Sequence, residues 1–163
     1  ARRYMQEEDF EHFIFSYHGV PERQIRKGDH TGKTCQFGSC CDRITPDNQL
    51  CYRAQCFETT RQLVAALGLQ EGTYTTAFQS RLGRDPWIQP YTEDLVKRLP
   101  KEGKTKVLAF SPAFVSDCLE TTIEVGEEYK ELFEEHGGKH WQLVECLNAS
   151  PIWVDLLEEL IRS

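Results

Sequence analysis

The sequence contains no run of apolar residues near the roughly 20 that a membrane-spanning helix requires, so no membrane span is predicted. It also contains no block of lysine and arginine residues, and its formal net charge at pH 7 is −7. This acidic balance argues against nucleic acid and anionic membrane surfaces as partners, and it is compatible with a cationic substrate.

Several motifs that would identify common enzyme classes are missing as well. The phosphate-binding patterns GxGxxG and GxxxxGK[ST] do not occur, and neither does the GxSxG pattern of serine hydrolases. No signal peptide is visible in the polar, acidic N-terminal residues, so we expect a cytoplasmic protein. The first residue is Ala1 rather than methionine, so we also expect an earlier part of the protein, with any targeting segment, to be missing from this chain.

The residues that are present fit one globular domain with a parallel sheet. The chain has 163 residues, of which 39% are hydrophobic and 28% charged, which suits a single domain over residues 1–163. Apolar runs predict strands at 11–17, 74–78, 107–110 and 141–147, and helical patterns follow them at 50–67, 92–101, 116–131 and from 151 onwards. This alternation predicts a three-layer α/β/α fold with a four-stranded parallel sheet, in which the last helix packs through Ile152, Val154, Leu157, Leu160 and Ile161.

The helix that follows the third predicted strand is unusually acidic. One interpretation is a solvated helix face. The other is functional, because the first glutamate follows the carboxyl end of a buried strand, where open α/β sheets bind ligands, and the carboxylates behind it could pass on a cation or protons. The spacings of three and four residues predict one shared face for Glu120, Glu124, Glu127, Glu128 and Glu131.

A histidine ends the first predicted strand at the same edge of the sheet. His18 is followed by a glycine and then, two residues later, a proline, which stop the strand. A histidine and a carboxylate that arrive from two strand ends form an acid–base or metal-ligand pair. The loop at 79–87 adds a flat apolar surface at Trp87 and two arginines, Arg81 and Arg84, that could bind carboxylates. The alternative is that the tryptophan belongs to the core and the arginines pair with nearby acids.

Four segments of the chain resemble the signature segments of the ferrochelatase family. They are SYHGVP at 16–21, FQSRLGRDPWIQPYTED at 78–94, SPAFVSDCLETTIEVGEE at 111–128 and LNASP at 147–151. The resemblance covers the chain except for the loop at 28–50. It implies a chelatase-like fold, the C-terminal half of a protein with two similar α/β domains. Ferrochelatases insert ferrous iron into a porphyrin in the last step of haem biosynthesis, so it also implies a lyase with Fe²⁺ and porphyrin as substrates.

The resemblance also implies roles for particular residues. His18 corresponds to the family's essential histidine and Glu120 to its essential glutamate, and both would face the porphyrin centre and the incoming iron. The remaining glutamates of the acidic helix match the family's acidic path from the site to the surface. Trp87, Pro86 and Tyr17 would form part of the porphyrin-binding wall.

The cysteine-rich loop is where the chain departs from many bacterial members of the family. Five of the seven cysteines fall between Cys35 and Cys56. Because seven is an odd number and no secretion signal is visible, metal or cluster binding is favoured over a disulfide framework. Some ferrochelatases carry a [2Fe–2S] cluster, so the resemblance implies one in the loop at about 28–56, with a zinc site or free thiols as alternatives. The candidate ligands are Cys35, Cys40, Cys41 and Cys51.

These inferences lead to one main functional hypothesis. The full-length protein would insert Fe²⁺ into protoporphyrin IX to give protohaem, and this half would be inactive without its N-terminal domain. The alternatives are a coproporphyrin ferrochelatase or another tetrapyrrole chelatase and, from a different class, a non-catalytic module that binds metal or tetrapyrrole. Peripheral membrane association, which some family members show, is a further expectation.

Overall fold

The structure is a computed structural model that describes all 163 residues. Its strands are β1 (His12–His18), β2 (Tyr74–Gln79), β3 (Lys106–Phe110) and β4 (His140–Leu143). Its α-helices are α1 (Arg2–Glu7), α2 (Glu22–Gly28), α3 (Tyr52–Leu67), α4 (Thr92–Arg98), α5 (Tyr129–Glu135) and α6 (Pro151–Arg162). Two 3₁₀ helices, η1 (Ser39–Cys41) and η2 (Leu99–Glu102), and a π-helix, η3 (Glu120–Glu128), complete the secondary structure.

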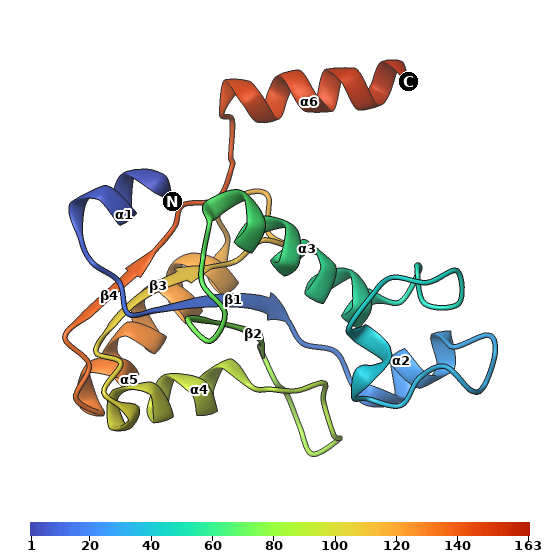
Figure 1. The fold of residues 1–163 in the computed structure, drawn as a ribbon, viewed down its shortest axis with the longest axis horizontal. Helices are drawn as coiled ribbons and strands as arrows, with labels where there is room; N and C mark the ends of the chain where they lie inside the picture. Colours follow the sequence, from blue (N-terminus) through green and yellow to red (C-terminus); the bar gives the residue numbers. More distant parts are fainter.

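The strands form one sheet in the order β2-β1-β3-β4, and every neighbouring pair is parallel. In Figure 1, α3 lies on one side of the strands, and α4 and α5 lie on the other. The predicted three-layer α/β/α fold with four parallel strands is therefore confirmed. The strands were visible in the sequence because a strand covered on both faces is apolar along most of its length.

The two faces of the sheet carry separate hydrophobic clusters. Successive residues of a strand point to opposite faces, so alternate residues of β1 belong to different layers. Ile14 packs with apolar residues of α4, η3 and α5, whereas Phe15 and Tyr17 pack on the side of α2 and α3. The ring of Phe15 stacks on that of Phe110 in β3, with 4.7 Å between the ring centroids. The position of a residue along a strand therefore decides which helix layer its side chain meets.

The order of the strands puts a topological switch point between β1 and β3, and we call the region outside their carboxyl ends the crevice. These strands are neighbours in the sheet although β2 lies between them in the sequence. The chain leaves β1 through α3 on one face and leaves β3 through η3 and α5 on the other. The carboxyl ends of two such strands border the place where open α/β sheets bind ligands. His18 is the last residue of β1 and Glu120 is the first of η3, so the fold brings both to this crevice.

Some boundaries differ from the prediction. The helix after β3 begins at Glu120 rather than at 116 or 117, because Asp117 makes a different contact: its carboxylate accepts a hydrogen bond from the side chain of Asn148 at 2.9 Å. β4 ends at Leu143 rather than at 147, and the short helix α2 was not expected. No helix is both long enough and apolar enough to cross a membrane.

The largest difference concerns α6. The predicted start is confirmed, since Ser150 is the N-cap and the proline after it is the first helical residue. The predicted packing is wrong for this chain: no residue of α6 is buried, and Ile152, Leu160 and Ile161 are exposed by 84%, 59% and 85%. Figure 1 shows the helix standing apart from the sheet and from α3. The apolar stripe was predicted correctly, but nothing in these 163 residues covers it.

Candidate active site

The imidazole of His18 stands at the carboxyl end of β1. Its Nδ1 lies 2.6 Å from the carbonyl oxygen of Gly19. A carbonyl oxygen only accepts hydrogen bonds, so Nδ1 carries the proton and Nε2 of the neutral ring keeps its lone pair. The backbone is fixed here by two more bonds. Gly19 donates its N–H to the carbonyl of Gln79 at 2.8 Å, and the Tyr52 hydroxyl donates to the carbonyl of His18 at 2.7 Å. The ring is therefore oriented with Nε2 as a base.

Aromatic rings and unsatisfied polar atoms gather at this end of the sheet. The ring centroids of Trp87 and Phe114 each lie 6.4 Å from the centroid of the His18 imidazole. The indole Nε1 of Trp87 and the hydroxyl of Ser111, which follows β3, are buried without a hydrogen-bond partner. Buried polar atoms are normally satisfied, so these two atoms are exceptions within the chain.

Glu120 faces the same crevice from the start of η3. The pKa of its carboxyl group is lowered, first by a hydrogen bond from its own backbone N–H, then by the thiol of Cys118. The positive form of His18 also lowers it, which requires the two side chains to lie within electrostatic reach of each other. His18 and Glu120 therefore lie at the same edge of the sheet, one at the end of β1 and the other at the start of the helix after β3. An ionised carboxylate beside an imidazole can bind a divalent cation and accept protons.

The glutamates behind Glu120 do not all share its face. The residues Glu120–Glu128 form a π-helix, which has about 4.4 residues per turn instead of 3.6. Every fourth residue stays on roughly the same side, so Glu124 and Glu128 remain close to the line of Glu120. Glu127 is seven residues on and turns away by more than half a turn. Glu127, Glu128 and Glu131 are all exposed. The predicted common face is therefore wrong for Glu127.

The π-helical winding could not be read from the sequence pattern. The indole N–H of Trp141 donates to the carbonyl of Val125 at 2.9 Å, which draws a carbonyl of the helix toward β4. Side chains that insert into the backbone ladder of a helix are a known cause of such distortions. The contact joins residues in two different elements, and a single-helix pattern does not contain it.

Glu124 is the most heavily bonded carboxylate of the acidic helix. Its Oε1 accepts hydrogen bonds from the backbone N–H of Ser80 and the hydroxyl of Tyr129, both at 2.8 Å. Its Oε2 accepts from the Ser80 hydroxyl at 2.6 Å and from the side-chain amide of Gln79 at 3.1 Å. A carboxylate has about four acceptor positions, so all of them are engaged. Glu124 and Glu128 also line a cavity of about 350 Å³ beside α4, together with Glu93 and Asp94.

The other predicted site residues lie in different surroundings. Tyr17 points to the opposite face from His18, is only 2% exposed, and its hydroxyl lies 2.9 Å from that of Thr60 in α3. The structure therefore places it in the core and not against a substrate, because neighbouring residues of a strand face opposite ways. Pro86 is exposed, next to the half-buried Trp87. Arg81 stacks on the ring of Tyr91, with 4.8 Å from its guanidinium carbon to the ring centroid.

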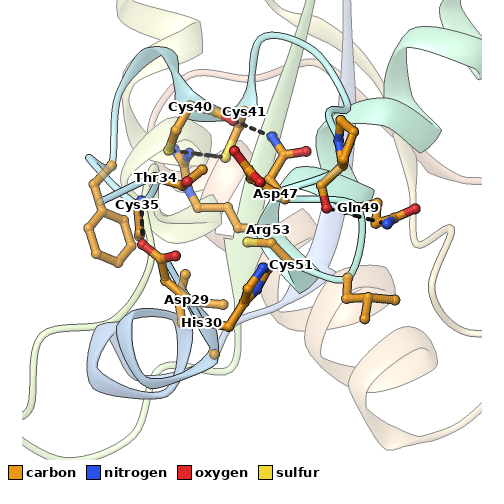
Figure 2. A pocket seen from close by; sticks show the side chains of 16 residues that line it. Asp29, His30, Thr34, Cys35, Cys40, Cys41, Asp47, Gln49, Cys51 and Arg53 are labelled. Atoms are coloured by element: carbon orange, nitrogen blue, oxygen red, sulfur yellow. Dashed lines mark hydrogen bonds between the residues drawn. The ribbon is translucent and has the colours of Figure 1, made fainter. Parts of the chain in front are cut away.

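The four candidate cluster ligands line one cavity of about 290 Å³ between α2 and the start of α3 (Figure 2). The Sγ atoms of Cys40 and Cys41 are 3.9 Å apart. Two thiolates on one tetrahedral ion with bonds of about 2.3 Å would be separated by about 3.8 Å. In contrast, no three histidine, cysteine or carboxylate side chains of the chain are arranged to hold a metal ion. The chain supplies four thiols and one suitably spaced pair, but no preformed single-ion site.

The thiols of this cavity differ in acidity. Burial raises the pKa of Cys41 to about 11, although the guanidinium of Arg53 donates a hydrogen bond to its sulfur at 3.0 Å. The pKa of Cys40 is lowered overall. Burial favours the neutral thiol, but hydrogen bonds from backbone N–H groups, first that of Gln36, outweigh the effect of burial. Because metals bind thiolates, loading the cavity would release protons from the thiols that become ligands.

Gln79, Ser80 and Phe114 were not among the site residues predicted from the sequence. Gln79 ends β2 directly opposite His18 in the register, and it is 1% exposed. A signal was present, because the polar pair Gln79-Ser80 closes an otherwise apolar strand at the edge where His18 and Glu120 meet.

Comparison with known proteins identifies the family. The family model described as ferrochelatase matches residues 1–163. A ferrochelatase from Pseudomonas fluorescens (strain SBW25) is 45% identical over 162 residues, which are 98% of this chain and 47% of the relative. One from Azotobacter vinelandii (strain DJ / ATCC BAA-1303) is 42% identical over 159 residues, which are 96% of this chain and 47% of the relative. The chain thus spans about half the length of the curated relatives it matches.

Among solved structures, a CbiX protein of cobalamin biosynthesis from Marinobacter aquaeolei VT8 aligns over 93% of this chain and 98% of its own. Its TM-score of 0.45 and identity of 18% are too low to support an inference. The family model matches all 163 residues of this chain, and the two relatives are 42 and 45% identical to it; these findings decide the family. The chain belongs to the ferrochelatase family.

Proposed function

We propose that the full-length protein inserts Fe²⁺ into a porphyrin and that this chain supplies the base and the carboxylate for that reaction. The observation that supports the proposal is the position of His18 at the end of β1 and of Glu120 at the start of the helix after β3, where two neighbouring parallel strands end. The charge of His18 also lowers the pKa of Glu120. Insertion forms four iron–nitrogen bonds and releases two protons from pyrrole N–H groups. The unprotonated Nε2 of His18 is suited to take the first proton, and the ionised carboxylate of Glu120 is suited to bind the incoming iron and receive the second.

The surroundings support a flat apolar substrate. The rings of Trp87 and Phe114 each lie 6.4 Å from the imidazole, centroid to centroid, and provide apolar surface beside it. We propose protoporphyrin IX as the porphyrin, in line with the main hypothesis from the sequence. Glu128, which borders the cavity beside α4, extends the acidic path toward the surface.

The test of this proposal is anaerobic metal insertion by the full-length protein. Protoporphyrin fluorescence should fall when Fe²⁺ is added, as the metal quenches the macrocycle, and coproporphyrin should react more slowly. A faster reaction with coproporphyrin would identify coproporphyrin, instead of protoporphyrin IX, as the substrate. Tight porphyrin binding without insertion of iron into either porphyrin would identify a binding module instead.

We further propose that the cysteine cavity holds a [2Fe–2S] cluster. The donors fit in kind and number, because such a cluster takes two thiolates on each iron and the cavity offers four thiols, among them the spaced pair at Cys40 and Cys41. Cys51 is the N-cap of α3, and Cys35 lies across the cavity in the loop. A bound cluster would supply a one-electron centre and a covalent tie between the loop and α3.

The cluster proposal predicts a brown protein whose colour depends on the loop. Anaerobically purified full-length protein should contain about two iron and two sulfide per chain beyond any substrate iron. Cys35→Ser and Cys41→Ser should each abolish the visible absorption, whereas Cys118→Ser, outside the cavity, should leave it intact. About one zinc per chain and no colour would support the zinc alternative, and absence of both metals would leave free thiols.

We also propose that the rest of the longer protein is the partner of this chain and that it covers α6. The curated relatives are about twice as long as this chain, and the exposed apolar stripe of α6 has no cover within the 163 residues. A helix with such a stripe is normally stabilised by packing it against another element.

Hydrogen exchange in the full-length protein checks this interface. The amides of α6 should be protected, and Leu160→Asp should raise their exchange rates at least tenfold, because it places a charge in an apolar contact. Glu159→Ala on the same helix is the matched control and should change little. Exchange in the wild type as fast as in an isolated helix would contradict the interface.

The cytoplasmic location and the peripheral membrane association remain predictions from the sequence. Separation of cell fractions followed by immunodetection would test both, because a peripheral protein leaves the membrane fraction at high salt.

A further inference from the structure

We propose that Gln79 is a positioning residue that holds His18 and Glu120 at a fixed separation. The inference rests on the proposed function of that pair. Gln79 is the last residue of β2, lies opposite His18 in the parallel register, and is 1% exposed. No hydrogen bond joins its side chain to the imidazole of His18 or to the carboxylate of Glu120, so it acts through the backbone and through neighbouring groups.

The two oxygen atoms of Gln79 bind the strand that carries His18. Its backbone carbonyl accepts the N–H of Gly19, the residue directly after His18, at 2.8 Å. Its side-chain Oε1 accepts the hydroxyl of Ser16 at 2.7 Å, and Ser16 lies two residues before His18. Gln79 therefore fixes β1 on both sides of the catalytic histidine.

The side-chain nitrogen of Gln79 binds the helix that begins with Glu120. Its side-chain Nε2 donates to the backbone carbonyl of Glu120 at 2.7 Å and to the carboxylate of Glu124 at 3.1 Å. The side-chain amide has two N–H groups, so both are engaged. A single buried residue thus connects the end of β1 with the first turn of η3.

The residue after Gln79 reinforces this connection. Ser80 has a φ of 63°, in the left-handed region that side chains other than glycine rarely adopt. Its N–H and its hydroxyl both donate to Glu124, at 2.8 and 2.6 Å, which compensates for the unfavourable conformation. Strained backbone held by several bonds is typical of sites that must keep a fixed geometry.

Separation matters here because the two groups must act on one ion and one macrocycle. His18 and Glu120 reach the crevice from different strands, and no hydrogen bond joins their side chains. A displacement of about 1 Å in a catalytic group can lower the rate about 100-fold. Supporting residues of metal ligands typically contribute 10- to 100-fold to affinity or activity.

The test compares two substitutions in the full-length protein. Gln79→Leu removes every side-chain hydrogen bond, and Gln79→Glu keeps the shape but replaces the N–H donors with an oxygen that faces Glu124. The matched control is Gln62→Leu on α3, since Gln62 also donates to a glutamate, Glu58, at 3.0 Å, but on the exposed surface. The measurements are kcat, the KM for Fe²⁺ and for porphyrin separately, and the Kd for Co²⁺ without porphyrin, from its visible absorption.

Both Gln79 variants should lower kcat about 10- to 100-fold and raise the Kd for Co²⁺ about tenfold or more, with porphyrin KM within twofold of the wild type. A purely structural role would lower all parameters together, in proportion to the folded fraction seen by circular dichroism. That result, or wild-type kcat and Co²⁺ affinity in the folded Gln79→Glu variant, would overturn the inference. His18→Ala and Glu120→Ala are measured alongside: if they remain active, the proposed function fails, and if only the Gln79 variants remain active, the inference alone fails.

Discussion

Replacing His18 with alanine in the full-length protein should lower kcat for iron insertion by about 10²- to 10⁴-fold, the usual contribution of a positioned base. In the neutral imidazole Nε2 is the nitrogen without a proton, because Nδ1 donates to the carbonyl of Gly19. Glu120→Ala should cause a loss of similar size, since it removes the carboxylate that faces the same space. Fluorescence loss of the porphyrin under anaerobic Fe²⁺ measures both, and porphyrin binding should persist in each variant.

The matched controls come from α5 and the turn after it. His136 also places its Nδ1 against a backbone carbonyl, that of Leu132 at 2.8 Å, but it lies away from the crevice. His136→Ala and the exposed Glu134→Ala should keep kcat within twofold of the wild type. Activity retained in both His18→Ala and Glu120→Ala would remove the catalytic assignment.

Gly19→Ala should produce the second large effect, although it adds only one methyl group. A Cβ at this position would lie 2.8 Å from the carbonyl oxygen of Gln79 and 3.0 Å from Cε3 of Trp87. The first neighbour is backbone of β2, which cannot move without disturbing the sheet. We expect kcat to fall about 100-fold, as His18 is displaced, and the free energy of unfolding to fall by about 1–3 kcal/mol.

Enzyme assay and urea unfolding of the same preparations separate these two effects. Gly28→Ala is the control, because no atom lies within 4 Å of the added methyl group there. It should leave both kcat and stability close to the wild-type values. If Gly19→Ala behaves like Gly28→Ala, the close contact between the end of β1, β2 and Trp87 is not maintained in the protein.

The elements that the sequence predicts well are those whose own residues determine them. The central strands are apolar because both faces are covered, and the glycine, proline and serine at the helix ends act through local backbone preferences. The meeting of His18 and Glu120 was predictable for a related reason: in a parallel sheet the carboxyl ends of the strands share one edge.

The features that escaped prediction depend on contacts between distant residues. The π-helix involves the indole of Trp141, and the burial of Tyr17 depends on which face of β1 packs against α3. Gln79 looked like an ordinary polar residue at a strand end until the fold placed it between β1 and η3. The predicted packing of α6 was wrong for another reason. The sequence shows that a stripe is apolar, but it does not show which surface covers that stripe.

The four hydrogen bonds on Glu124 have a consequence for the movement of iron. The carboxylate attracts a divalent cation over a distance of about 10 Å at 0.1 M ionic strength. Each of its oxygens is already saturated by protein donors, so an arriving ion would have to break those bonds before it could coordinate there. Under the proposed function, such a group would draw ions inward without retaining them. Capture would then fall to Glu120 and the imidazole of His18, which have free positions for a metal ligand.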